Sequence, residues 1–202
     1  MKSVLLILVG ASLFILAPFS RTLAHCDGLD GPVVQAAQKA IATGDVNLVL
    51  IWVQKRDEDE VRKIFKETIA VRKLSLEARQ LADMHFFETL VRLHRAGEGA
   101  GFTGLKPAGR DLGPAIPAAD KALRDANVER LINLMTTTIE DRIRDHFNET
   151  FTKQKFSKDD LEAGRSFVNA YVKYVHCVET LYETATRPIH GHYDDTGKGA
   201  SH

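Results

Sequence analysis

The sequence predicts an all-α protein, an antiparallel helical bundle that is built from two similar halves. Three observations lead to this fold class: apolar residues recur at helical spacing over long segments, the alternation typical of strands is absent, and one block of sequence is repeated. With 44% hydrophobic and 27% charged residues among 202, the chain has an ordinary globular composition. Lys+Arg and Asp+Glu both number 27, so the basic excess of a nucleic-acid-binding protein is missing, and we expect no nucleic-acid partner.

The start of the chain, residues 1–24, has the features of an export signal. An apolar run over residues 4–19 has the length of a signal-peptide core and is short for a membrane span. Small residues near Ala24 predict cleavage after it, and so a periplasmic or extracellular protein without a membrane span. An uncleaved anchor is one alternative. A lipoprotein modified at Cys26 is another, which the bulky His25 disfavours.

A repeated block predicts the two halves. Residues 31–41 resemble residues 113–123 at an offset of 82, and the same offset pairs Phe65 with Phe147. Farther along the offset becomes 85, which requires a three-residue insertion. A competing offset of 91 requires nine inserted residues and is disfavoured. Chance similarity between amphipathic helices is the alternative to a duplication. The expected organisation is a helical domain over 25–188, with halves 31–96 and 113–186 joined by a Gly/Pro-rich loop 96–117, and a flexible His-containing tail over 189–202.

The helices are expected from apolar spacing and end signals. Pro32 suits a first helical turn, and Gly44 suits a helix end. Capping-box spacing starts at Asp57 and again at Ser157. Apolar residues spaced by three and four predict amphipathic helices over 32–44, 57–73 and 76–95 in the first half, with a short segment at 46–53 between them, and over 128–151 and 158–185 in the second.

The processed N-terminus is the sharpest candidate for a metal site. Cleavage would leave a chain that begins His25-Cys26, with an α-amine, an imidazole, a backbone amide and a thiolate within two residues. Planar nitrogen and sulfur ligands suit Cu(II) or Ni(II), and a thiolate favours soft ions such as Cu(I). Nickel or copper is therefore the expected cofactor. The predicted ligands are His25 and Cys26, with Asp30 or a histidine on a helix completing the set.

Residues 25–31 resemble the nickel hook of nickel superoxide dismutase, whose mature chain begins His-Cys-Asp-x-Pro-Cys-Gly. His25, Cys26, Asp27 and Gly31 match this pattern, whereas Asp30 replaces the second cysteine and Leu29 the proline. The resemblance implies metal binding by a processed N-terminus and a redox role. Two thiolates make nickel redox-active in that family, so the replacement at Asp30 bears on dismutation more than on metal binding.

Nearly the whole mature chain resembles an uncharacterised family of exported bacterial proteins. The resemblance rests on the His-Cys-Asp start and on the segments 86–92, 94–100 and 103–109. It implies a helical exported protein and assigns no activity.

A second set of metal-ligand candidates lies on the long helices. Di-metal carboxylate bundles place Glu-x-x-His pairs on facing helices, and this chain has pairs in the order His-x-x-Glu. An offset of 85 makes His94 equivalent to Glu179, so the two could face each other. Solvated His–Glu pairs are the alternative. The weaker metal candidates are His85 and Glu88, His94 with its i,i+4 neighbour Glu98, and His176, Glu179 and Glu183.

Two classes of function follow from these patterns. The first is metal binding or trafficking, with a redox activity related to nickel superoxide dismutase. The second is a non-enzymatic envelope or interaction protein. A homo-oligomer is possible in either class. Cys177 enters either as a buried free cysteine or as the disulfide partner of Cys26, which would remove the thiolate ligand.

Overall fold

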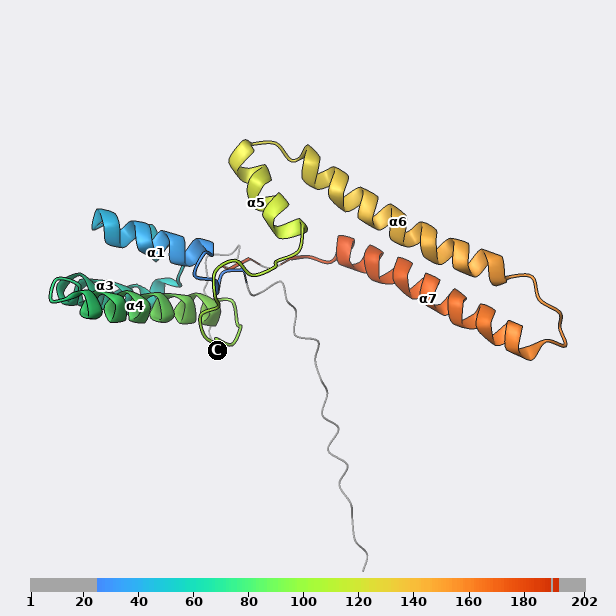
Figure 1. The fold of residues 1–202 in the computed structure, drawn as a ribbon, viewed down its shortest axis with the longest axis horizontal. Coiled ribbons are helices and arrows are strands. Elements are labelled where there is room, and N and C mark those ends of the chain that lie inside the picture. Colours follow the sequence, from blue (N-terminus) through green and yellow to red (C-terminus); the bar gives the residue numbers. More distant parts are fainter. Residues whose placement is uncertain (1–24, 190, 193–202) are drawn as a thin grey trace, which may run out of the picture.

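The computed structural model describes residues 25–189, 191 and 192, and this part of the chain is all-α (Figure 1). It contains no β-strand, only an isolated parallel bridge between Gly28 and Lys106. No helix in the described ranges is long and apolar enough to cross a membrane. The predicted signal peptide lies outside the described residues. The elements are α1 (Pro32–Thr43), α2 (Asn47–Leu50), the 3₁₀ helix η2 (Lys55–Asp57), α3 (Glu58–Val71), α4 (Leu76–Gly97), α5 (Ala115–Asp125), α6 (Glu129–Lys153) and α7 (Leu161–Thr186).

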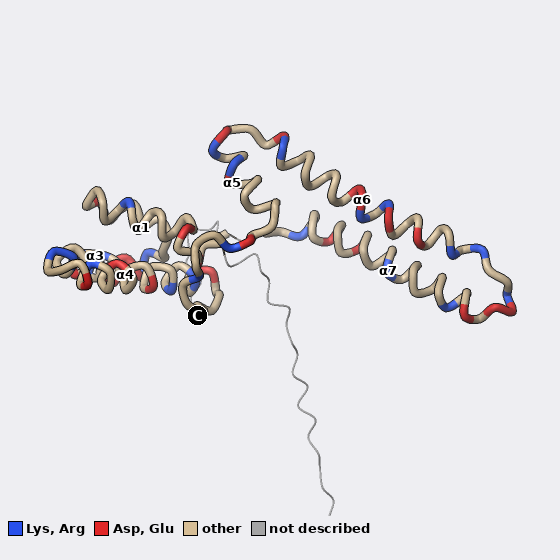
Figure 2. Tube along the Cα trace, viewed as in Figure 1, with Lys and Arg blue, Asp and Glu red and all other residues tan. Residues whose placement is uncertain are grey.

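Antiparallel packing occurs in two separate helix pairs, α3 with α4 and α6 with α7. Figure 1 shows α1, α3 and α4 grouped on one side and the α6–α7 hairpin extending on the other, with α5 between them. Positive and negative residues are interspersed along the long helices in Figure 2. The predicted all-α fold is confirmed. Its longest helices are divided between the two groups, α4 in the first and α6 and α7 in the second.

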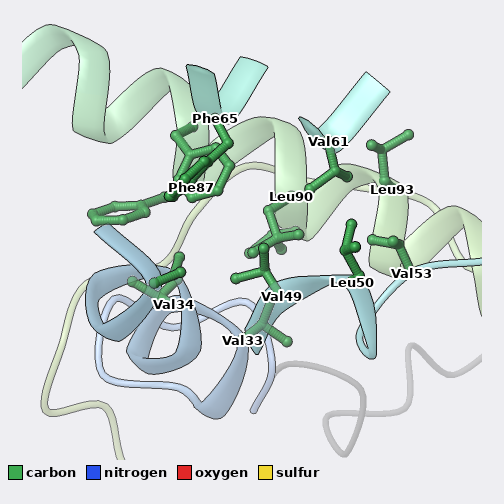
Figure 3. Close-up of a cluster of buried hydrophobic side chains, with 14 of the residues drawn as sticks. Val33, Val34, Val49, Leu50, Val53, Val61, Phe65, Phe87, Leu90 and Leu93 are labelled. Carbon is green, nitrogen blue, oxygen red and sulfur yellow. The ribbon is translucent and has the colours of Figure 1, made fainter. Parts of the chain in front are cut away.

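The hydrophobic core lies in the first group (Figure 3). Helix α1 begins with Pro32 in its first turn and ends at Gly44, which has a left-handed φ of 74°. Its apolar face packs against α2 and α4. Burial of each large core side chain stabilises the fold by about 1.5–3 kcal/mol. Fully buried members of the core include Val33, Val34, Val49, Val53, Val61, Phe86, Leu90 and Val91.

Two helices begin with side-chain N-caps, at positions other than the first residues of the predicted capping boxes. Ser75 and Asp160 are N-caps whose side chains accept the N–H of Ala78 and Ala163. Asp57 precedes α3 but makes no side-chain cap bond, because η2 holds its backbone in a helical conformation. The capping box predicted from Ser157 is therefore wrong by one turn, since Asp160 itself caps α7.

The helix bounds of the two halves agree at the predicted offsets. Shifting residues 47–71 by 82 gives the bounds of α6, and α7 begins 85 residues after α4. The halves differ at residues 51–54, which interrupt the first half between α2 and η2, whereas α6 continues without a break. The duplication itself stays a prediction, and this break has consequences for the site.

Candidate metal centre

The C-terminal end of α4 gathers three metal-ligating side chains. His94 and Glu98 come from α4 and its cap, and His192 comes from the far end of the chain. One ligand atom of each lies within 4.8 Å of the others. Within residues 25–189, 191 and 192, no other group of three His, Cys, Asp or Glu side chains meets this condition.

The ring of His94 has one nitrogen hydrogen-bonded to the backbone and the other facing Glu98, which is the arrangement of a metal-ligating histidine. Its side chain is 4% exposed, and its Nδ1 lies 2.8 Å from the backbone oxygen of Trp52. A carbonyl oxygen only accepts, so Nδ1 carries a proton, and in the neutral ring Nε2 is the nitrogen with the lone pair. Nε2 is buried without a hydrogen-bond partner and lies 3.4 Å from Oε1 of Glu98. A backbone carbonyl on the second ring nitrogen is the usual support of a ligand histidine.

His192 is held against His94 by the end of α4. The two imidazoles stack with centroids 4.8 Å apart and planes 20° from parallel. Gly97 permits His192 to lie this close to α4, because a Cβ at residue 97 would lie 2.6 Å from Cε1 of His192. The side-chain amide of Gln54 donates to the His192 carbonyl at 2.7 Å and to the Gly97 carbonyl at 3.4 Å. Burial and then the neighbouring His94 lower the pKa of His192, which favours the neutral ring.

The interruption at residues 51–54 supplies both supports of this site. Trp52 offers its carbonyl to His94 and packs the edge of its ring on the imidazole, with centroids 5.8 Å apart. Gln54 holds the C-terminal segment in place. A continuous helix would have tied the Trp52 carbonyl to an N–H one turn later. The break in the first half therefore builds the site.

Arg95 connects the site to the N-terminal segment. Its side chain is 6% exposed, and it donates from Nη1 to Oε2 of Glu98 at 2.8 Å. Its Nε lies 3.4 Å from Oδ1 of the buried Asp27. One guanidinium thus balances two carboxylates, and it turns the other oxygen of Glu98 toward His94.

The N-terminal segment lies beside this network and is anchored to the Gly-rich loop. The backbone N–H of Lys106 donates to the backbone oxygen of Asp27 at 2.8 Å, and the N–H of Leu29 donates to the backbone oxygen of Lys106 at 3.0 Å. Cys26 is half-buried, and burial, followed by Glu98 and Asp27, raises the pKa of its thiol to about 11. Cys26 therefore carries its proton at neutral pH unless a metal ion displaces it.

Two of the three predicted N-terminal ligands have other partners. Nε2 of His25 lies 3.0 Å from Oδ2 of Asp120 on α5. Asp30 accepts the N–H of Gly109 at 2.7 Å, and this bond lowers the pKa of its carboxyl. The structure does not bring His25, Cys26 and Asp30 together within 4.8 Å.

The predicted helix-borne ligands are distributed along two faces. His85 and Glu88 are exposed on α4, and His176, Glu179 and Glu183 are exposed on α7. Of these weaker candidates, His94 and its i,i+4 neighbour Glu98 enter the three-residue cluster, and its third member is His192 rather than Glu179. Cys26 and Cys177 are both free, so the disulfide alternative is not present.

Several contributors escaped the sequence analysis. Trp52, Gln54, Arg95 and Gly97 were not among the predicted site residues. The i,i+4 spacing of His94 and Glu98 was visible, but nothing local places residue 192 beside them.

Comparison with known proteins adds a family. Residues 30–177, which include His94 and Glu98, match the model of a family described as "Family of unknown function (DUF6448)". No curated protein and no solved structure matches the chain.

Proposed function

Because the chain belongs to this family of unknown function, we propose its function from the site: it binds one transition-metal ion through His94, Glu98 and His192. The observation that carries the proposal is the orientation of His94. The Trp52 carbonyl accepts a hydrogen bond from Nδ1, so the buried Nε2, which lies 3.4 Å from a carboxylate oxygen, carries the lone pair of the neutral ring.

The spacing and the chemistry of the ligands support a metal ion. Metal–ligand bonds of about 2.05 Å in a tetrahedral site separate the ligand atoms by about 3.3 Å. The 3.4 Å between His94 and Glu98 is close to that separation, and a small movement of His192 would complete a triad. Two imidazoles and one carboxylate suit Zn²⁺ as well as the predicted nickel and copper. Three protein ligands would leave a coordination position open for water or a substrate.

The rival interpretation is an ordinary ion pair between a protonated His94 and Glu98. It predicts no stoichiometric uptake of metal. Native mass spectrometry and titration calorimetry of the purified protein with Cu²⁺, Ni²⁺ and Zn²⁺ separate the two. One tightly bound ion per chain supports the site, and absence of binding for all three ions refutes it.

Variants locate the ion. His192→Ala and Glu98→Gln should each weaken binding at least about tenfold, because each removes one ligand. His176→Ala is the matched control, since His176 is an exposed histidine on α7 outside the cluster. Equal affinity in His192→Ala and the parent protein would overturn this assignment.

A narrower proposal keeps the ion at the N-terminus, with His25, Cys26 and Asp30 as ligands and a redox role related to nickel superoxide dismutase. Its motivation is the resemblance of residues 25–31 to the nickel hook. These side chains would first have to leave Asp120 and Gly109. Loss of binding in Cys26→Ser but not in His192→Ala would favour this hook.

Export with cleavage after Ala24 is proposed as well, and only the hook depends on that cleavage. A mature chain that begins at His25 would carry a free α-amine, which the hook needs and the His94 site does not. The mass of the protein recovered from its natural compartment tests cleavage after Ala24. The alternative of a non-enzymatic interaction protein has its own support in the exposed face of α6 and α7.

A further inference from the structure

The α6–α7 hairpin exposes many large apolar side chains. On α7, Val168, Val175 and Tyr182 are spaced by seven residues, the repeat of helices that pack against other helices. Large apolar side chains are exposed on α6 as well, where Ile139, Ile143 and Phe147 line a groove with Tyr174 of α7. We call this surface the hairpin face. Its exposed members are Ile132, Met135, Phe147 and Phe151 on α6, and Val168, Tyr171, Val172, Val175, Val178 and Tyr182 on α7.

The corresponding positions in the first half are buried. Tyr171, Val172, Val175 and Val178 are 38–50% exposed, whereas the residues 85 positions earlier, Phe86, Phe87, Leu90 and Leu93, are at most 7% exposed. Those α4 residues lie in the core that α1 covers. The same pattern of apolar positions is thus covered in one half and uncovered in the other.

The uninterrupted α6 explains why α5 does not cover the hairpin face. In the first half the break at 51–54 redirects the chain, and α1 packs against both α2 and α4. In the second half α6 is straight across the corresponding residues 133–136, and α5 packs at the N-terminal end of α6 (Figure 1). Within residues 25–189, 191 and 192, therefore, neither α1 nor α5 covers this face.

The charges that border the hairpin face match a second copy of it. Arg165 and Glu183, which in the single chain pair with Glu162 and Arg187, lie on the same side of α7, because 18 residues make five complete helical turns. Their midpoint is Tyr174. In an antiparallel pair of α7 helices centred there, Arg165 of each copy lies opposite Glu183 of the other. Twofold symmetry forms this ion pair twice and brings Val175 close to its own copy.

We propose that the hairpin face binds the same face of a second copy, with the two α7 helices antiparallel. The apolar side chains supply the stability of this dimer, and the paired charges set its orientation. The contact would bury side chains that are exposed in the single chain, as α1 does in the first half. This inference is independent of the metal site.

Sedimentation equilibrium over a range of micromolar concentrations tests the proposal. The parent protein should be a dimer, and Val175→Lys should be a monomer with unchanged helix content by circular dichroism. Leu81→Lys is the control, because Leu81 is 74% exposed on α4 of the other half. A monomeric parent protein, or a dimer that Val175→Lys leaves intact, would overturn the proposal.

Charge reversal tests the antiparallel arrangement. Arg165→Glu and Glu183→Arg should each raise the dimer dissociation constant about tenfold, because each sets like charges opposite one another twice. The double variant Arg165→Glu/Glu183→Arg should restore the parent value. Failure of the double variant to recover would show that the copies meet in another way and would overturn the arrangement.

Discussion

His94, on α4, donates a hydrogen bond from its Nδ1 to the backbone oxygen of Trp52 over 2.8 Å, and Trp52 lies in the non-helical segment between α2 and η2. This bond determines which ring nitrogen faces Glu98 and His192. A change in any of the groups that hold these two histidines should therefore be measurable as a change in metal affinity.

Gly97→Ala should weaken metal binding without loss of fold. The new Cβ would lie 2.6 Å from Cε1 of His192, so the ring must move away. Mutation of residues that support a metal ligand typically lowers metal affinity about 10–100-fold. Alanine also favours the helix over glycine, so the melting temperature should stay equal or rise. Calorimetric titration and thermal unfolding check both parts, and unchanged affinity would contradict the placement of His192.

Arg95→Met should destabilise the protein by about 3 kcal/mol, because it leaves the buried carboxylate of Asp27 and that of Glu98 without their cation. Urea unfolding measures the loss. The control is Arg92→Met: Arg92 pairs with Glu60, and both side chains are about half exposed. Such a surface pair contributes less than about 1 kcal/mol. Equal losses in the two variants would show that Arg95 is not part of a buried network.

The contact between Asp30 and Gly109 should depend on pH. The Gly109 N–H stabilises the carboxylate and lowers the pKa of Asp30. The contribution of this bond is therefore complete above the usual pKa of an aspartate, about 4. It is lost as the pH falls through the lower value in the folded protein. Carboxyl chemical shifts and protection of the Gly109 amide from hydrogen exchange follow the loss, and Asp30→Asn should abolish its pH dependence. An unshifted titration would disprove the contact.

Cys26 should react slowly with alkylating agents at neutral pH. Burial and two nearby carboxylates raise the pKa of its thiol to about 11, and the thiolate is the reactive form. The rate of iodoacetamide modification, measured by mass spectrometry of the Cys26 peptide, should keep rising with pH beyond the usual range for cysteine. A rate that levels off near pH 8.5 would indicate an ordinary thiol.

Leu90→Ala should cost about 2–5 kcal/mol of unfolding free energy, because it opens a cavity in the core beneath α1. The matched change 85 residues later, Val175→Ala, should cost less than about 1 kcal/mol when measured at protein concentrations low enough to keep the chain monomeric. Urea unfolding compares them. Similar costs would mean that the second half is as well packed as the first.

Local patterns in the sequence were sufficient for the all-α class and for the approximate helix bounds. The spacing of apolar residues and the end signals Pro32 and Gly44 are properties of positions within one or two helical turns of each other. The offsets of 82 and 85 come from repeated residues that can be read directly from the sequence. The i,i+4 relation of His94 and Glu98 belongs to the same class, because a regular helix places such residues on one face.

Only the tertiary structure decided how the site is completed and which apolar faces are covered. Residues 51–54 contain neither Gly nor Pro, so the break that frees the Trp52 carbonyl has no local signal. His192 reaches His94 across nearly half of the chain because Gly97 leaves space and Gln54 provides a hydrogen bond. Likewise, Leu90 and Val175 follow the same apolar pattern, and only the paths of α1 and α5 determine which one is buried. Contacts between distant residues depend on how whole helices pack, and a periodic pattern records which face is apolar but not what covers it.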